Sequence, residues 1–204
     1  MFALVLGTAA LMTASPSTQA APNAKAEPQV FVAEVVDELI RNVQTQVKKG
    51  PLSMSQIHDI VNQDILPYVD LSKTTRLAAG KYWRQATPEQ QKALTEAFGE
   101  TLIRTYSGAL TRVDSGTNMK ILPFRGDVNA KDVVVQSSVT ESSNTSPIRI
   151  DYRLEKSNDG WKIYDLNVEN IWLIQNYRNQ FAQQIDRGGI DGLIQSLKKR
   201  AATP

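Results

Sequence analysis

Apolar residues in the first part of the chain recur every three or four positions, which is the spacing of amphipathic helices. The first run stops at Gly50-Pro51 and the second before Pro67. The predicted helices cover residues 32–47, residues 53 or 55 to 66, and residues 70 or 72 to 83. We therefore expect residues from about 30 to 86 to form a mainly helical sub-domain, although no linker separates it from the rest.

The longest predicted helix begins at Thr87-Pro88-Glu89-Gln90, which combines a threonine N-cap, a proline at the first helical position and a capping-box glutamine. Its apolar side chains follow at a strict four-residue step. They are Leu94, Phe98, Leu102, Tyr106 and Leu110. The turn-rich residues 114–118 end this helix, so it presents one apolar stripe along its length.

Apolar and polar residues alternate after residue 118, as in β-strands with one buried face. Four strands are predicted, at residues 119–124, 133–141, 148–155 and 161–169. Residues 158–160 (Asn-Asp-Gly) favour a tight hairpin between the last two. Helical spacing returns over residues 173–185, stops at Gly188-Gly189 and resumes over residues 190–197. This order predicts an α+β fold in which helices cover one face of an antiparallel sheet.

The first 24 residues carry no charged side chain. Residues 2–12 form an apolar run, which is shorter than the ~20 residues that span a bilayer. Small and polar residues follow it, up to Thr18-Gln19-Ala20. Although no basic residue precedes the run, we interpret residues 1–20 as a secretory signal peptide that is cleaved near Ala20. Residues 21–204 then form one exported domain, and the absence of cysteine favours a bacterial periplasm.

Chemically reactive side chains are few. The chain has no cysteine and one histidine, His58, which rules out disulfides, thiolate metal sites and a histidine-rich metal centre. The 23 Lys and Arg residues against 21 Asp and Glu give a net charge of +2, without the basic excess of nucleic-acid-binding proteins. We therefore expect no metal, no cofactor, no nucleic-acid partner, and binding rather than catalysis.

The remaining candidates for chemistry each have a simpler structural interpretation. His58 lies within a predicted helix without a framing catalytic motif. Asp165 and Glu169, four positions apart on the last strand, could form an acid–base pair, but salt bridges to nearby cations are the simpler alternative. The glycines of residues 188–192 favour a helix end over a phosphate-binding loop, because a helix precedes them. The cations of residues 198–200 complement the dipole at the end of the last helix.

Two blocks of the sequence resemble one known family. The blocks are residues 160–169 (GWKIYDLNVE) with 173–181 (LIQNYRNQF), Gly189, 191–194 and Leu197, and residues 76–84 (RLAAGKYWR) with 87–91 (TPEQQ), Phe98 and Tyr106. In this order and spacing they resemble the MlaC, or toluene-tolerance, family of periplasmic phospholipid-binding proteins. The resemblance extends from about residue 30 to residue 199. It departs at Asn170-Ile171-Trp172, where the family usually has Gly-Val-Ser, which leaves the role of that corner open.

The resemblance implies both a fold and a function. The implied fold is a curved, four-stranded antiparallel sheet packed against helices, a cone of the nuclear-transport-factor kind, with an added helical sub-domain. The implied ligand is a glycerophospholipid whose acyl chains occupy a deep apolar pocket. The implied partners are an inner-membrane ABC transporter complex and an outer-membrane lipoprotein–porin complex, between which the carrier shuttles lipid to maintain outer-membrane asymmetry. We expect the carrier itself to be a monomer.

The apolar stripes have two interpretations, because periodicity does not distinguish a filled core from the wall of a cavity. If the stripes form the wall of a cavity, the pattern places an acyl-chain pocket between the long helix, the sheet and the first C-terminal helix. Its predicted lining comprises Phe98, Leu102, Tyr106, Leu110, Val135, Ile150, Tyr152, Val168, Tyr177 and Phe181.

Three functions remain as alternatives. The first is the non-enzymatic phospholipid carrier. The second is a small-molecule enzyme of the isomerase or dehydratase type on the same cone-like fold, which would need Asp165 together with His58 or Tyr152. The third is an interaction module without a ligand, which predicts a filled core and no pocket.

Overall fold

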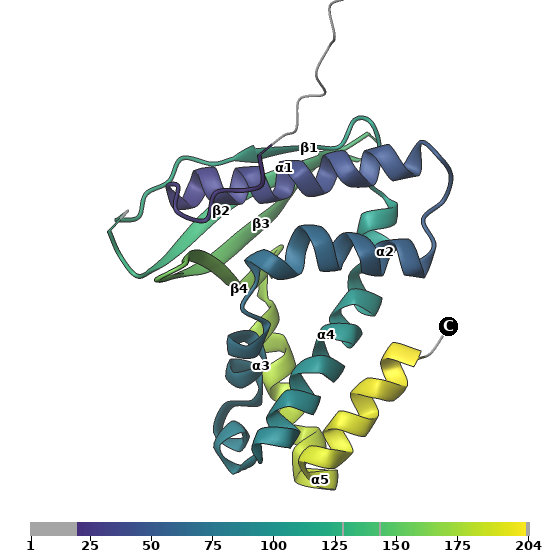
Figure 1. The fold of residues 1–204 in the computed structure, drawn as a ribbon, viewed down its shortest axis with the longest axis vertical. Coiled ribbons are helices and arrows are strands. Elements are labelled where there is room, and N and C mark those ends of the chain that lie inside the picture. The colour runs from purple at the N-terminus through teal and green to yellow at the C-terminus, as the bar shows by residue number, and fades with distance from the viewer. Residues whose placement is uncertain (1–19, 128, 143, 203–204) are drawn as a thin grey trace, which may run out of the picture.

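The computed structural model describes residues 20–127, 129–142 and 144–202. The proposed signal peptide, except for Ala20, lies outside the described residues. The fold is α+β, with a curved antiparallel sheet and helix α1 in one half of the molecule and helices α3, α4 and α5 in the other (Figure 1). The predicted fold class is therefore confirmed.

The helices before the sheet follow the predicted order. They are α1 (Pro28–Val47), α2 (Met54–Ile60), the π-helical turn η1 (Val61–Ile65), the 3-10 turn η2 (Leu66–Tyr68), α3 (Leu71–Ala79), the 3-10 segment η3 (Gly80–Gln85) and α4 (Pro88–Thr111). The side chains of Ser53, Asp70 and Thr87 cap α2, α3 and α4 by accepting a hydrogen bond from the third amide of each helix. The capping signals in the sequence thus place three helix starts correctly.

The sheet has five strands in sequence order, not the four that the sequence predicts. They are β1 (Asn118–Ile121), β2 (Asp132–Glu141), β3 (Asn144–Ser157), β4 (Gly160–Val168) and β5 (Ile171–Trp172). The additional strand β5 is two residues long and pairs with the end of β4. Glu169 and Asn170 join the two with positive φ angles of 48° and 70°, the combination found in tight hairpin turns. A two-residue strand is too short to show any alternation, which is why the pattern missed it.

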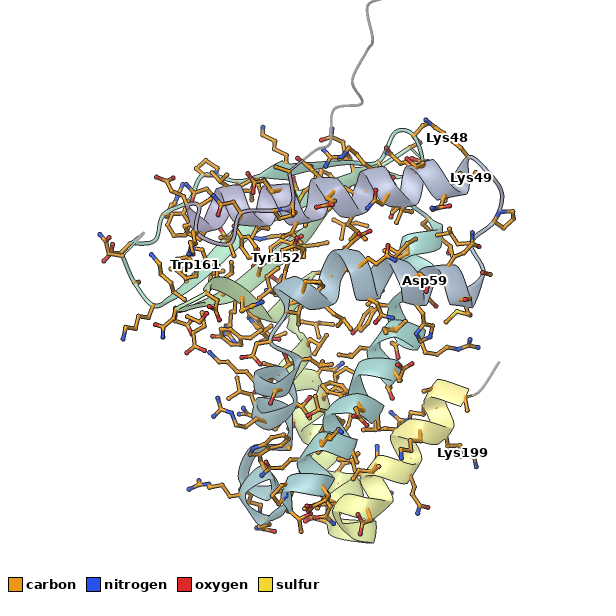
Figure 2. All side chains as sticks on the ribbon, viewed as in Figure 1. Lys48, Lys49, Asp59, Tyr152, Trp161 and Lys199 are labelled. Atoms are coloured by element: carbon orange, nitrogen blue, oxygen red, sulfur yellow. The ribbon has the colours of Figure 1, made fainter. Side chains whose placement is uncertain are left out.

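Helix α1 covers one end of the apolar face of the sheet. We call the buried group formed there the sheet cluster: Phe31, Val32, Val35, Val133, Val135, Tyr152, Leu154, Trp161 and Ile163. The labels in Figure 2 place Tyr152 and Trp161 next to α1. The preceding residue Gly160 has a φ of 112°, and a side chain there would overlap the carbonyl of Ala24, which accepts a hydrogen bond from the Trp161 amide. The chain approaches β4 so closely here that only glycine fits.

Helix α5 (Leu173–Ala202) consists of two arms joined at Gly189, whose φ of 68° and ψ of −175° interrupt the helix. The predicted stop at Gly188-Gly189 and the new start at Ile190 are therefore correct. Both arms pack on α3 and α4 around a second buried group, which we call the helix cluster: Ala78, Ala79, Leu94, Ala97, Phe98, Tyr177, Phe181, Ile185, Leu193, Ile194 and Leu197.

Candidate functional site

Helix α4 passes through two different surroundings. All of its buried residues lie in the first 14 positions, and Thr101 is the last of them. Beyond Thr101 the apolar stripe continues, but Leu102 and Leu110 are only partly buried and Tyr106 is 42% exposed. The second half of α4 therefore presents apolar side chains that no other described element covers fully.

The apolar face of the sheet changes in the same way along its strands. At one end it belongs to the sheet cluster under α1. At the other end Val139 pairs with Ile148, and Ile150 pairs with Val168. The first three of these are partly buried, and Val168 is 38% exposed. This end of the sheet thus keeps the apolar alternation of a buried face without being fully buried.

Both incompletely covered surfaces lie at the same end of the molecule. Arg112, directly after α4, is 3.6 Å from Glu141 at the end of β2. Gln44 of α1 donates to the carbonyl of Asp114 at 2.7 Å in the connection to β1. We call this the half-covered region. It comprises residues 102–110 of α4 together with Met119, Val139, Ile148, Ile150 and Val168 of the sheet.

Helix α2 lies between α1 and α4 beside this region, as Figure 1 shows. His58 Nδ1 is 3.6 Å from Glu100 of α4, and Asn42 of α1 donates to Asp64 of η1 at 2.9 Å. The one histidine of the chain thus contributes to the contact between two helices. Its structural interpretation agrees with this placement.

The ten predicted lining residues divide equally by burial. Phe98, Val135, Tyr152, Tyr177 and Phe181 are buried, whereas Leu102, Tyr106, Leu110, Ile150 and Val168 are not. The buried five belong to the two clusters, with Val135 and Tyr152 in the sheet cluster and the other three in the helix cluster. Their role as pocket lining stays a prediction, but the structure places the other five around the half-covered region.

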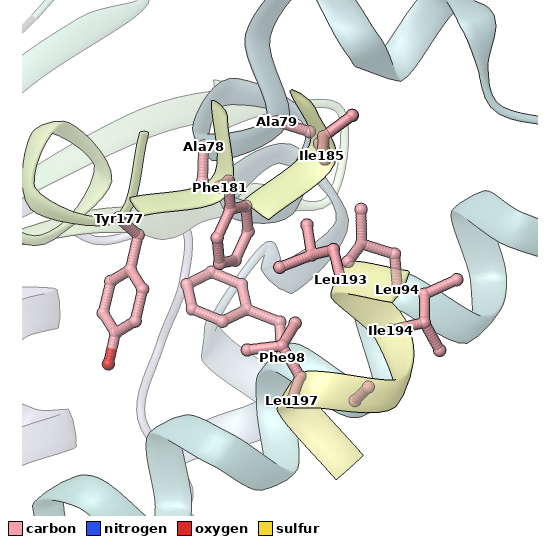
Figure 3. Packing of buried hydrophobic residues seen from close by; sticks show 11 residues of the cluster. Ala78, Ala79, Leu94, Phe98, Tyr177, Phe181, Ile185, Leu193, Ile194 and Leu197 are labelled. Carbon is pink, nitrogen blue, oxygen red and sulfur yellow. The ribbon is translucent and has the colours of Figure 1, made fainter. Parts of the chain in front are cut away.

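Three aromatic rings form the end of the helix cluster nearest to that region. Phe98 packs edge-on against Tyr177 and Phe181, with ring centroids 4.7 and 4.9 Å apart. Figure 3 shows Tyr177 at one side of the cluster, with its hydroxyl directed away from the leucine and isoleucine side chains. Leu102 and Leu173 pack against the same cluster. These aromatic rings therefore form the boundary of the helix cluster at the point where α4 extends beyond it.

The sheet contributes a buried hydroxyl pair. Ser137, fully buried, donates to the Ile150 carbonyl at 3.1 Å and lies 3.4 Å from the Tyr152 hydroxyl. Burial raises the pKa of Tyr152 to about 12. A tyrosine that acts as a general base needs a lowered pKa, so this hydroxyl is poorly suited to proton abstraction.

Asp165 organises the corner that departs from the family pattern. It accepts hydrogen bonds from Arg153 at 3.1 Å and from the amides of Leu166 and Ile174, each at 3.0 Å. Burial raises the pKa of Asp165, although Arg153 and the amides favour its charged form. The Arg153 guanidinium also stacks 3.8 Å from the ring centroid of Trp172. Asp165 thus caps α5, and the salt-bridge interpretation is correct for it.

The residues needed for the enzyme alternative do not come together. The register pairs Arg153 with Asp165 and Tyr152 with Leu166, so Asp165 and Tyr152 point to opposite faces of the sheet. His58 instead contacts Glu100 of α4. Within residues 20–127, 129–142 and 144–202, no three His, Asp or Glu side chains gather in a way that could hold a metal ion.

The glycine-rich segment 188–192 lies at the kink of α5, as predicted for a helix end. A polar groove of about 460 Å³ follows the kink, lined by Arg187, Arg200, Ser196 and three glutamines, among others. Its polar lining makes it unsuitable for acyl chains. In the part of the chain that the structure describes, no helix combines the length and the hydropathy needed to cross a bilayer.

Three of the sheet residues in the half-covered region were not among the predicted lining. Met119, Val139 and Ile148 lie on the same face as Ile150 through strand pairing. Alternation within each strand marks them as inward-facing, and it is the signal that could have included them.

Comparison with known proteins agrees with the resemblance. The family model described as "MlaC protein" matches residues 33–199. The intermembrane phospholipid transport system binding protein MlaC of Haemophilus influenzae is 25% identical over 89% of this chain and 85% of that protein. The toluene tolerance protein ttg2D of Pseudomonas putida is 27% identical over 80% and 75%. A phospholipid-binding protein from Ralstonia solanacearum, solved in complex with a phospholipid, is 40% identical, with a TM-score of 0.80 over 87% of this chain and 98% of that chain.

Proposed function

The chain belongs to the MlaC family, and from this membership we propose that it is a phospholipid carrier that encloses acyl chains in the half-covered region. The observation that carries the proposal is the Ralstonia solanacearum protein, which shares 40% of the sequence and nearly its whole fold with this chain and was solved with a phospholipid bound. At this identity and coverage, a common ligand class is the natural inference.

The half-covered region supports the proposal physically. Its apolar stripe on α4 (Leu102, Tyr106 and Leu110) faces the same end of the molecule as the apolar residues of the sheet. Enclosing an acyl chain between such surfaces contributes about 0.8 kcal/mol for each CH₂ group removed from water. Apolar contacts therefore provide ample affinity, and transfer of a lipid between membranes requires no catalytic group. On this basis we propose a carrier rather than an enzyme.

The proposed setting is the periplasm, reached through a signal peptide that is cleaved near Ala20. Residues 21–204 would act there as one lipid-binding domain, as a monomer. The proposed partners are the inner-membrane ABC transporter complex and the outer-membrane lipoprotein–porin complex of an asymmetry-maintaining system. The Haemophilus influenzae relative, described as part of an intermembrane phospholipid transport system, supports this setting.

Lipid content tests the proposal. We expect organic extraction of the purified protein, followed by mass spectrometry, to release about one glycerophospholipid for each chain. The delipidated protein should then take up labelled phospholipid from vesicles. A protein that is purified empty and extracts no lipid from vesicles would contradict the carrier function.

A further inference from the structure

Tyr177 combines a fixed ring with an unused hydroxyl. Its side chain is only 5% exposed, and its ring packs against Phe98 and Phe181. No hydrogen bond joins its hydroxyl to another of the described residues. The oxygen is also not among the fully enclosed polar atoms that lack a partner, so it remains accessible at the end of the helix cluster. A buried tyrosine normally satisfies its hydroxyl, so this one calls for a partner.

Tyr106 presents a second hydroxyl to the same place. It lies two turns beyond Phe98 on the apolar stripe of α4, within the half-covered region. Partial burial raises the pKa of Tyr106, and the nearby Tyr177 raises it further. The Tyr106 hydroxyl is therefore protonated at neutral pH and able to donate. Among the described residues, nothing accepts a hydrogen bond from Tyr106 either.

Other tyrosines of the chain differ from this pair. The hydroxyl of Tyr82 donates to Asp186, and that of Tyr164 donates to Asp132 at 2.8 Å. The Tyr152 hydroxyl lies beside Ser137 and the sulfur of Met119. Three of the other four tyrosines thus have protein partners, and Tyr68 in the other half of the molecule does not. Tyr106 and Tyr177 differ from Tyr68 because they leave two donors together where the helix cluster meets the half-covered region.

We propose that Tyr106 and Tyr177 bind the ester carbonyl oxygens that join the acyl chains of the bound phospholipid to its glycerol. This assignment rests on the proposed carrier function. A phenol is a neutral donor on an apolar ring, which suits a neutral carbonyl at the top of a hydrocarbon chain. A phosphate anion calls for charge-assisted donors, and Arg178, the cation next to Tyr177, instead donates to the Leu77 carbonyl. The two tyrosines thereby set how deep the acyl chains enter.

Short-chain lipids allow a direct test, because they dissolve as monomers. Calorimetry would measure binding of dihexanoyl phosphatidylglycerol, and of its diether analogue without carbonyls, to delipidated wild type, Tyr106→Phe, Tyr177→Phe and the double variant. Each substitution removes a donor and keeps the ring. We expect each to weaken diester binding about fivefold. Diether binding should change less than about twofold, because that lipid has no carbonyl to lose.

Tyr68→Phe is the matched control, since Tyr68 also lacks a hydrogen bond to the described residues but lies beside Phe31 in the other half of the molecule. It should bind both lipids like wild type. Equal losses for diester and diether lipids, or no loss for either, would overturn the ester assignment while leaving the carrier function intact. Wild-type protein that binds neither lipid would overturn both.

Discussion

The helix cluster and the half-covered region are built from the same kinds of side chain along one helix, yet they differ in packing. In the helix cluster, Leu94 and Phe98 are completely enclosed by α3 and both arms of α5. One and two turns later, Leu102 is partly buried and Tyr106 is 42% exposed. The apolar residues of the helix cluster are thus packed for stability, whereas those of the half-covered region remain available for contact with a ligand.

Helix α4 therefore has two tasks, divided near Thr101. Thr101, the last buried residue of α4, donates to the Leu197 carbonyl of α5 at 3.1 Å. Beyond this point α4 continues toward the open end of the sheet, where Arg112 meets Glu141. The first half of α4 is held rigidly in the helix cluster. The second half can therefore present a rigid apolar surface without being buried itself.

Truncation in the two regions should separate these tasks most strongly. In the delipidated protein we expect Phe98→Ala to lower the free energy of unfolding by about 3–5 kcal/mol, because it leaves a cavity in the helix cluster. Leu110→Ala should cost about 1 kcal/mol or less, because that side chain is already partly solvated. Urea denaturation measures both. Equal costs would mean that the half-covered region is tightly packed without lipid. That result would contradict the difference in packing between the two regions.

Filling the half-covered region should affect lipid rather than folding. Leu102→Trp or Tyr106→Trp adds volume where acyl chains are proposed to lie, and we expect at least about a tenfold loss of bound lipid, equivalent to about 1.4 kcal/mol. Mass spectrometry of extracted lipid measures the load. Val134→Trp is the control, because Val134 is exposed on the opposite face of the sheet. If all three variants carried a full load, α4 would not form the wall of the site.

Alkaline titration tests whether water reaches the Tyr152 hydroxyl in the sheet cluster. The pKa of Tyr152 is raised to about 12, so above pH 10 the unfolded chain loses this proton first. Stability should therefore be complete below pH 10 and fall as the pH rises toward 12, by about 1.4 kcal/mol for each pH unit from this group. Tyr152→Phe should show a shallower fall in chemical denaturation. An identical slope in both proteins would show that water reaches the hydroxyl.

The smallest expected effect concerns the β4–β5 turn, which holds Val168 at the edge of the half-covered region. Asn170 has a φ of 70°, which asparagine tolerates and alanine does not. We expect Asn170→Ala to cost about 1 kcal/mol in thermal or chemical unfolding. Asn170→Gly should cost nothing. A full cost for the glycine variant would show that the asparagine side chain, rather than the backbone conformation, matters here.

The sequence predicts the helices and strands of this molecule better than it predicts which of their apolar side chains are buried. The caps at Ser53, Asp70 and Thr87 place helix starts, and the glycines at 188 and 189 place the break in α5. These are local signals, so they can be recognised without the fold. The π-helical turn at residues 61–65 carries no comparable signal, and the predicted second helix ran through it.

The candidate site depends on relations that no local pattern contains. The stripe from Phe98 to Leu110 is uniform in sequence, and only the position of α5 decides that Phe98 is enclosed and Leu110 is not. In the same way, Asp165 caps a helix that begins eight residues later, across a turn and a short strand. Strand register, which groups Met119 and Val139 with Ile150, likewise follows from pairing rather than from composition.

Acyl-chain photolabelling would locate the bound lipid in the half-covered region. The delipidated protein would be loaded with a phospholipid that carries a diazirine at the end of one acyl chain, irradiated, digested and analysed by mass spectrometry. We expect adducts on residues 102–110 of α4 and on the Ile148–Ile150 and Val168 part of the sheet. Adducts confined to apolar residues exposed elsewhere, such as Val30 and Val134, would contradict it.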